Sequence, residues 1–385
     1  MLSKGNHIHL MCYEKIENYA DCEKIISLPY FSLKRVSDVE KLFEIIRDEK
    51  YDVIINSNSR IMALLSPYIN NNTIIITISH SLRYTESDVS AFNAKYVDGI
   101  VALSNYNKDY LERKFSIKDE NKIKVIYNFV LPIENADELR AAKKNSDEIT
   151  IVYAGGTASS KSPELVIKIL NRLIDTDLKF RFYFLGVKTP PLKKIQPFKN
   201  IESVIKKDKR VIMPGKVPSS EAKEIIAKAN IFLSPSRREG CPMALIEALR
   251  VGTIPIVADY KIANRELIKD GVNGFVIGHT DTDAFVERIE DIIREPSNYQ
   301  FIYDNSYRLY TELLTYEVWY NKITEFFNSN LSTHEERLNG FSAKRYRLDN
   351  YRFILMDFFN KIHLFFHESL PAAIPIMLMY IKRQK

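Results

Sequence analysis

Short apolar runs rich in valine and isoleucine alternate with longer amphipathic segments in the first part of the chain. These runs occupy residues 8–12, 51–56, 73–79, 97–104 and 122–128. Between two of them, the segment 37–49 has helical spacing, with Ser37 as the expected N-cap and Glu40 completing a capping box. This alternation predicts right-handed βαβ units with parallel strands.

A polar segment over residues 132–147 interrupts the alternation and is interpreted as an interdomain linker. The alternation then resumes with the runs EITIVYAG, KFRFYFLG, RVIMPG, NIFLSPS, TIPIVA and GFVIG. Helices are expected between or after these runs, at 163–174 and 283–295. Two successive sheets of about 150 residues each predict an α/β protein with two Rossmann-like domains. Ligands are expected in the cleft at the carboxyl ends of the strands.

The expected domains are residues 1–146, residues 147–310, a helix at 311–330 that packs back on the first domain, and a helical extension at 331–385. Within this extension, residues 342–385 carry eight basic and three acidic side chains among many aromatic and apolar ones. This composition suits an interfacial helix on an anionic membrane. Packing on the first domain is the alternative, and the sequence leaves both open.

The composition is that of an ordinary globular protein, with 45% apolar and 27% charged residues in a chain of 385. The three cysteines, Cys12, Cys22 and Cys241, are odd in number and widely spaced, which favours a reducing compartment over disulfides or a zinc site. The net charge of +6 is scattered and no nucleic-acid motif accompanies it. The first ten residues do not resemble a signal peptide, and no apolar run reaches 18 residues. We therefore expect a cytoplasmic protein, with contact to the inner face of the membrane as an option.

The most informative segment covers residues 230–258. A buried strand is expected up to Ser234, followed by a polar loop and a helix from about Met243 to Val251. Pro242 suits the first turn of such a helix, and Gly252 suits the position after its end. A helix that begins at the carboxyl end of a parallel strand points free N–H groups into the cleft, where a diphosphate can bind.

Two glutamates in this segment, Glu239 and Glu247, are eight residues apart. The spacing alone is uninformative, because it recurs on charged helical segments at Glu112/Glu120, Glu287/Glu295 and Glu317/Glu325. The context differs, because Glu239 is in a loop and Glu247 is in an otherwise apolar helix. A carboxylate in such a place needs a partner, and sugar or ribose hydroxyls are suitable ones. A salt bridge from Glu247 to a neighbouring helix is the alternative.

The segment PSRREGCPMALIEALRVGTIPIV resembles the Glu-x7-Glu signature of the retaining family 4 glycosyltransferases, which have the GT-B fold. The resemblance extends over roughly residues 148–290, through RVIMPGKVPSSEAKEIIAKAN and RELIKDGVNGFVI. It implies a donor-binding second domain, transfer from a nucleotide sugar with retention, and no metal. The first domain resembles the family's acceptor-side domain only loosely, and the usual first strand and glycine-rich loop are not recognisable in it.

The resemblance implies a role for each matching position. Glu239 would contact hydroxyls of the transferred sugar, and Glu247 the ribose. Lys161, in YAGGTASSKSPEL, would neutralise the leaving diphosphate. His80 ends an expected strand at the cleft, so it would contact sugar or acceptor unless it is a structural histidine; with Glu239 and Lys161 it forms the expected catalytic set. The expected donor-binding residues are Gly155, Gly156, Thr157, Lys161, Gly215, Lys216, Val217, Arg237, Arg238, Glu239, Gly240, Cys241, Pro242, Met243, Ala244, Leu245 and Glu247.

This chain also departs from the family pattern. Gly156 stands where the family has an arginine, so one expected diphosphate cation is missing, and Arg237 or Arg238 is the suggested substitute. Cys241 and Pro242 replace the usual Phe-Gly, and Pro242 has no amide to donate to the sugar.

The favoured function is transfer of a hexose-type sugar from a UDP- or GDP-sugar to a glycan or lipid-linked acceptor in the synthesis of a cell-surface polysaccharide or lipopolysaccharide. No cofactor is expected besides the nucleotide sugar as co-substrate, and no nucleic acid. One alternative is a non-catalytic paralogue or subunit that binds nucleotide sugar or a partner enzyme, which Gly156 and the unrecognised first strand favour. A nucleotide-sugar epimerase on the same fold is the other. A dehydrogenase is disfavoured, because YAGGTASS lacks the G-x-G-x-x-G pattern.

Overall fold

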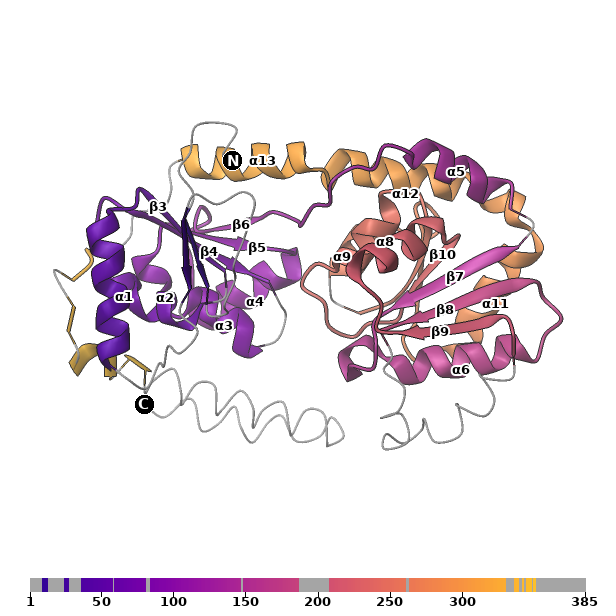
Figure 1. The fold of residues 1–385 in the computed structure, drawn as a ribbon, viewed down its shortest axis with the longest axis horizontal. Helices are drawn as coiled ribbons and strands as arrows, with labels where there is room; N and C mark the ends of the chain where they lie inside the picture. The colour runs from indigo at the N-terminus through magenta and orange to yellow at the C-terminus, as the bar shows by residue number, and fades with distance from the viewer. Residues whose placement is uncertain are drawn as a thin grey trace.

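The protein is described from a computed structural model. The described residues are 9–12, 24–27, 36–57, 59–80, 84–146, 148–186, 208–260, 263–329 and, in the extension, 336–338, 341–342, 344–347 and 349–350. In this part of the chain two parallel sheets form separate α/β domains (Figure 1). The predicted two-domain α/β architecture is therefore confirmed.

The first domain is built on a parallel sheet with the strand order β3-β4-β5-β6. Its strands are β3 (Val53–Ser57), β4 (Ile74–Ser79), β5 (Gly99–Ala102) and β6 (Ile123–Val125). Its helices are α1 (Val36–Glu49), α2 (Arg60–Leu65), α3 (Tyr84–Ala91) and α4 (Asn105–Phe115), with 3₁₀ turns at Ser66–Tyr68 and Ala94–Tyr96. A separate parallel pair joins β1 (His9–Cys12), which was predicted, to β2 (Lys24–Ser27), which was not.

Helix α1 shows how the sequence pattern fixes packing in this domain. Val39, Leu42, Phe43 and Ile46 are buried, and their spacing of three and four residues places them on one face of the helix. The expected cap at Ser37 is wrong, because the helix already includes Val36 and Ser37 lies within its first turn. A residue with helical backbone cannot serve as the N-cap.

The second domain has a parallel sheet in the order β12-β11-β10-β7-β8-β9. Its strands are β7 (Ile149–Ala154), β8 (Phe180–Leu185), β9 (Val211–Gly215), β10 (Ile231–Ser234), β11 (Ile254–Ala258) and β12 (Phe275–Ile277). Its helices are α6 (Pro163–Ile174), α8 (Ser219–Lys228), α9 (Met243–Leu249), α10 (Ala263–Leu267), α11 (Thr282–Arg294) and α12 (Gln300–Leu313), with 3₁₀ turns at Ser159–Lys161 and Pro296–Tyr299. Chain order reverses between β7 and β10, so the topological switch point of the sheet lies there.

The sequence accounts for the position of each strand in this sheet. Every residue of β10 and β11 is buried, as expected for continuous apolar runs that are covered on both faces of a parallel sheet. Pro214 is in β9, the strand at one edge, where a missing backbone N–H is tolerated.

The predicted linker is largely helical and lies on the second domain. Helix α5 (Ala136–Lys144) occupies most of it. The Lys143 Nζ atom donates to the Val251 carbonyl at 3.1 Å and to the Thr253 hydroxyl at 2.7 Å. Asn230 Nδ2 donates to the Lys143 carbonyl at 3.1 Å. Burial lowers the pKa of Lys143 well below the ordinary lysine value.

The chain crosses between the domains twice, and the two crossings touch. The Val130 amide donates to the Leu314 carbonyl at 3.3 Å, and the Tyr310 hydroxyl donates to the Val130 carbonyl at 3.0 Å. After the second crossing, helix α13 (Tyr316–Asn328) runs along the first domain (Figure 1). Phe326 packs so closely over Gly99 that a Cβ there would lie 2.4 Å from its ring.

One side chain of the extension, Arg337, is anchored in the first domain. Its guanidinium donates to the carbonyls of Tyr96 at 2.9 Å, Asn70 at 2.7 Å and Thr73 at 2.7 Å. It also forms an ion pair with Asp98 at 2.7 Å, in which the side chains are 1% and 12% exposed. Burial lowers the pKa of Arg337, and the Asp98 carboxylate opposes this effect.

Aromatic contacts continue this packing along the extension. The ring of Phe341 lies 5.3 Å from that of Tyr68, 5.7 Å from that of Phe43 and 5.9 Å from that of the buried Tyr346. The described residues of the extension therefore pack on the first domain, which is the alternative to an interfacial membrane helix. Residues 351–385, which carry most of the proposed membrane-binding segment, lie outside the described residues. In the described part of the chain, no helix combines the length and apolar character needed to cross a membrane.

We predict that Arg337→Ala destabilises the first domain by about 3–5 kcal/mol, because it removes the guanidinium that is paired with the buried Asp98 carboxylate. Urea unfolding followed by circular dichroism measures this change. Arg347, an exposed residue ten positions further along, provides the control. Arg347→Ala is expected to stay within about 0.5 kcal/mol of wild type. Equal midpoints for the two variants would contradict the anchoring role of Arg337.

Candidate active site

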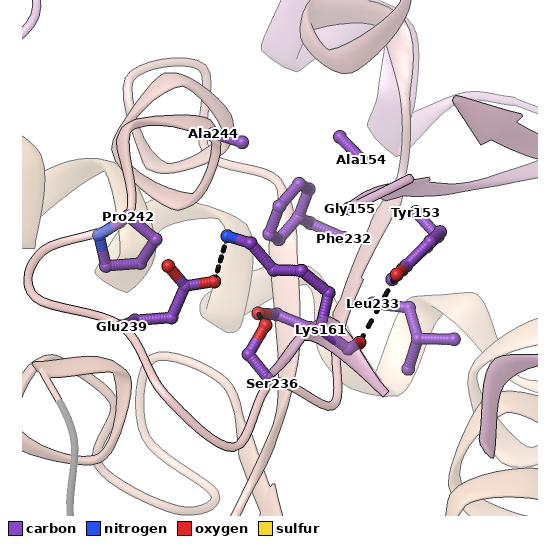
Figure 2. A pocket seen from close by; sticks show the side chains of 11 residues that line it. Tyr153, Ala154, Gly155, Lys161, Phe232, Leu233, Ser236, Glu239, Pro242 and Ala244 are labelled. Carbon is purple, nitrogen blue, oxygen red and sulfur yellow. Dashed lines mark hydrogen bonds and ion pairs between the residues drawn. The ribbon is translucent and has the colours of Figure 1, made fainter. Parts of the chain in front are cut away.

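A pocket lies at the carboxyl ends of β7 and β10, at the switch point of the second sheet (Figure 2). Open parallel sheets bind ligands at this place because the connections from the two strands lead to opposite faces of the sheet. The residues that line the pocket are Tyr153, Ala154, Gly155, Lys161, Phe232, Leu233, Ser234, Ser236, Glu239, Pro242 and Ala244.

Two of the predicted catalytic residues meet in this pocket. Lys161 comes from the loop after β7 and Glu239 from the loop after β10, and Lys161 Nζ donates to Glu239 Oε1 (Figure 2). Their side chains are 29% and 11% exposed, so the pair is partly shielded from water. Residues 78 positions apart in sequence thus place opposite charges side by side.

Tyr153 supports the loop that carries Lys161. Its hydroxyl donates to the Gly156 carbonyl at 3.1 Å and to the Lys161 carbonyl at 3.3 Å. Burial raises the pKa of Tyr153, so the hydroxyl remains a donor. The sequence alone does not reveal Tyr153 as part of the site, because a tyrosine in an apolar strand has the same pattern as an ordinary core residue.

Gly156 has a left-handed backbone, with φ of 60°, and a Cβ added there would lie 3.0 Å from the Gly186 carbonyl oxygen. The Gly156 amide donates to the Leu185 carbonyl at 3.2 Å. An arginine at this position would be strained by its backbone alone. Gly156 therefore allows the backbone conformation of this loop, in addition to removing the cation that an arginine would supply.

The two arginines suggested as substitutes do not line the pocket. Arg237 Nη2 donates to Glu164 Oε1 on α6 at 2.8 Å, and the Arg237 amide donates to the Ser160 carbonyl at 2.8 Å. Arg237 therefore ties the two pocket loops together from outside. Arg238 is half-buried. A cationic role for either residue stays a prediction.

The loop before α9 is buried at Gly240, Cys241 and Pro242. Pro242 is the N-cap of α9, and therefore lies one position before the expected first turn. The Leu245 amide donates to the Pro242 carbonyl at 3.1 Å, so it already has a partner within the helix, and its role in ligand binding stays a prediction. Burial raises the pKa of the Cys241 thiol to about 12, which keeps it protonated. Two more backbone amides are predicted to bind the donor. Their residues are Ala244, which lines the pocket, and Met243, which is exposed.

Glu247 lies on α9 and is 8% exposed. Burial raises the pKa of its carboxyl group, and the charges of Lys223 and Arg250 oppose that effect. Lys223 Nζ, on the neighbouring helix α8, lies 3.8 Å from Glu247 Oε1, and its side chain is 51% exposed. The alternative interpretation of Glu247 is a salt bridge to a neighbouring helix. Lys223 supplies the cation for that salt bridge, at a distance near the upper limit for an ion pair.

The other predicted site residues are at the same edge of the sheets but outside the pocket. Gly215 ends β9, and Lys216 and Val217 follow it, two strands away from β7. Thr157 lies in the loop after β7 and does not line the pocket. His80 follows β4 in the first domain, where its Nε2 is 2.7 Å from the Ser57 hydroxyl. His80 is thus at the carboxyl edge of the first sheet.

Among the described residues, no three histidine, cysteine, aspartate or glutamate side chains come together in an arrangement that could hold a metal ion.

We predict that Gly156→Ala lowers the free energy of unfolding by about 1–2 kcal/mol, because an L-residue is strained in the left-handed region. Gly278→Ala is the matched control, since its backbone is not left-handed and the nearest atom to an added Cβ is 3.7 Å away. Urea unfolding of both variants checks the difference. A Gly156 variant as stable as the Gly278 variant would show that the loop adopts another conformation.

We also predict that Glu247→Gln stabilises the protein at about pH 8 and does so less at about pH 4. The folded-state pKa of Glu247 is raised, so stability is lost as pH rises from the ordinary glutamate value through the raised value. Glutamine removes that loss. Thermal unfolding at the two pH values measures the difference between variant and wild type. A gain that is constant with pH would show that Glu247 ionises as freely as an exposed glutamate.

Residues 135–309 match the family model described as glycosyl transferases group 1. Among curated proteins, the chain is similar to UDP-Gal:alpha-D-GlcNAc-diphosphoundecaprenol alpha-1,3-galactosyltransferase of Escherichia coli, at 23% identity over 278 residues, 67% of this chain and 70% of that protein. It is also similar to a Campylobacter jejuni protein, GalNAc-alpha-(1->4)-GalNAc-alpha-(1->3)-diNAcBac-PP-undecaprenol alpha-1,4-N-acetyl-D-galactosaminyltransferase, at 24% identity over 311 residues, 76% of this chain and 82% of that protein. With some other relatives the match is shorter, and for one from Salmonella typhimurium it covers 38% of the relative's length.

Among solved structures, sucrose-phosphate synthase of Thermosynechococcus elongatus has a similar fold, with a TM-score of 0.65 at 16% identity over 85% of this chain and 89% of that one. This likeness agrees with the GT-B arrangement of the two sheets. The segment that matches the family model holds the pocket of Lys161 and Glu239. The comparisons support a glycosyltransferase with the GT-B fold.

Proposed function

We propose that the chain transfers a hexose-type sugar from a UDP- or GDP-sugar to a glycan or lipid-linked acceptor in the synthesis of a cell-surface polysaccharide or lipopolysaccharide. The observation that carries this proposal is the contact of Lys161 with Glu239 in the switch-point pocket. A nucleotide sugar joins a diphosphate directly to a sugar ring. It therefore needs a cation and a hydroxyl-binding carboxylate next to each other.

Donor binding then exchanges the partners of this ion pair. The diphosphate oxygens take the place of Glu239 on Lys161, and sugar hydroxyls donate to the carboxylate that Lys161 releases. Hydrogen bonds to ionised groups are the stronger ones, so both exchanges can be favourable. Lys161 gains most as the leaving diphosphate acquires charge, which lowers the barrier to transfer. We propose that Lys161 and backbone amides neutralise this charge without a metal.

Two further features, one in the pocket and one on the helix that follows it, support donor binding. Gly155 lines the pocket without a side chain, so the backbone can approach a phosphate closely. Glu247 is buried with its pKa raised, a costly state that hydroxyl donors of a ribose would relieve. Retention at the anomeric carbon is proposed from the likeness of residues 239–247 to the Glu-x7-Glu signature of retaining enzymes.

The proposed acceptor comes from the similar proteins. The names of the Escherichia coli and Campylobacter jejuni relatives describe sugars linked through a diphosphate to undecaprenol. A lipid-linked glycan is therefore the acceptor class we propose for this chain. It would approach from the first domain, where His80 lies at the carboxyl edge of the sheet.

We predict that two substitutions in the pocket have different effects on ligand binding. Lys161→Met should weaken binding of both UDP (or GDP) and the nucleotide sugar by about 10–100-fold, because a hydrogen bond to a charged group is worth about 1.5–3 kcal/mol. Glu239→Gln should retain binding of the free nucleotide, because Lys161 is then unpaired, and should lose the additional affinity that the sugar provides. Thermal stabilisation over a panel of nucleotides and nucleotide sugars measures both effects. For wild type, a ligand at 100 times its Kd adds about 2.7 kcal/mol.

The controls are Lys168→Met on the exposed side of α6 and Glu287→Gln on α11, which should leave binding unchanged. The Glu247→Ala variant should lose nucleotide affinity if Glu247 binds the ribose. Transfer is then tested with an undecaprenol-diphosphate glycan and the donor that stabilises the protein. The proposal fails if no nucleotide sugar stabilises wild type, or if the donor is converted to an isomer when no acceptor is present.

A further inference from the structure

Helix α10 joins the two domains through one carboxylate. Glu266 accepts hydrogen bonds from the Asn105 amide at 2.9 Å, the Asn105 side-chain amide at 3.0 Å and the Tyr106 amide at 2.8 Å. It also accepts from the Tyr127 hydroxyl at 2.9 Å. Glu266 belongs to the second domain and all four donors belong to the first. A single side chain thus carries four hydrogen bonds across the domain boundary.

These donors include the first two backbone amides of α4, which have no partner within the helix. The Ser104 hydroxyl accepts from the Asn107 amide and leaves the amides of Asn105 and Tyr106 to Glu266. A negative charge at a helix N-terminus is favourable. Glu266 therefore caps a helix of the other domain. Burial and the Glu266 charge both raise the pKa of Tyr127, so that hydroxyl stays protonated and able to donate.

The other end of α10 reaches the wall of the active-site pocket. Asn264 is buried, and its side-chain amide donates to the Ser234 hydroxyl at 2.9 Å. Ser234 lines the pocket at the end of β10. Asn264 and Glu266 are two residues apart on a helix of five residues, so a shift of one moves the other. The pocket wall and the start of α4 are thus linked by one short rigid element.

A second contact runs in parallel from the same segment of the first domain. Asn128, next to Tyr127, donates from its side-chain amide to the Cys241 carbonyl at 3.2 Å. Cys241 lies in the loop between Glu239 and α9. The segment that follows β6 therefore touches both α10 and the pocket loop. Movement at the pocket would therefore reach the first domain at two points, through Asn128 from the pocket loop and through Glu266 from α10.

We propose that Glu266 is a positioning residue, which couples the occupied donor pocket to the placement of the first domain against it. This inference rests on the proposed function. Donor in the pocket holds Ser234 and α10 in place, and Glu266 then holds the start of α4 and Tyr127 at the cleft. The acceptor-side surface is thereby brought to the sugar. Without Glu266 the donor still binds, but the acceptor domain is no longer held in the position for transfer.

The test compares Glu266→Ala, Glu266→Gln and Tyr127→Phe with wild type, and Glu312→Ala on the exposed side of α12 serves as control. Amide hydrogen exchange at Asn105 and Tyr106 reports the contact without any turnover. We expect exchange there to increase at least tenfold in Glu266→Ala. Glutamine keeps one acceptor oxygen, so Glu266→Gln should restore part of the protection. Tyr127→Phe removes one donor outside α4 and should change the exchange least.

The catalytic readout separates positioning from donor binding. We expect Glu266→Ala to lower kcat for transfer at least tenfold, while stabilisation by the free nucleotide stays within twofold of wild type. In wild type, nucleotide sugar should add protection at Asn105 and Tyr106, and in Glu266→Ala it should not. The proposal is overturned if exchange and transfer are both unchanged in Glu266→Ala, or if nucleotide binding is lost together with transfer. If no nucleotide sugar binds wild type, the proposed function fails, whereas the exchange measured without ligand still decides whether Glu266 holds α4.

Discussion

The constraint on which the rest of the structure depends is the reversal of strand order between β7 and β10. Both strands are largely buried and parallel, and their connections lead away to opposite faces, so a space remains at their carboxyl ends that neither connection covers. Lys161 and Glu239 enter that space from the two loops. The Tyr153 hydroxyl bonds to one loop, and the Arg237 amide joins the other loop to it at the Ser160 carbonyl. The sheet thus positions the two loops, and the loops carry the charged side chains of Lys161 and Glu239.

Any ligand of the pocket must also compensate the cost of separating the ion pair between Lys161 and Glu239. Lys161 and Glu239 neutralise each other in a partly buried place, where an unpaired charge is costly. A free phosphate offers a partner to Lys161 and would leave the carboxylate of Glu239 without one. A free sugar has the opposite defect. A molecule that carries both groups satisfies both charges, which is the reason that the proposed function assigns a nucleotide sugar to this pair.

The strands and helices of the second domain can be predicted from the sequence, whereas contacts between residues far apart in the chain cannot. The strands of that domain are continuous apolar runs, and α6 covers the predicted residues 163–174 because its apolar spacing and Pro163 at its start agree. The Glu239 region was found from its loop and helix context. The ion pair of Arg337 and Asp98 joins residues 239 positions apart, and the contact of Glu266 with Tyr127 joins residues 139 positions apart. Spacing along the chain carries no signal for such pairs, since tertiary packing alone decides them.

The two chain crossings between the domains lie next to each other at Val130 and Leu314, so the second domain is a continuous insertion with adjacent ends. Its entry and exit are side by side, and the segment that matches the family model, residues 135–309, lies between them. Replacing that segment would require two junctions that are already in contact, and it would also replace Glu266 and Cys241, which contact the first domain. Recombination at these junctions would leave the sheet of the first domain in place as long as the incoming segment keeps those contacts. Under the proposed function, the donor site and the acceptor-side surface would then change separately only where the contacts of Glu266 and Cys241 with the first domain are kept.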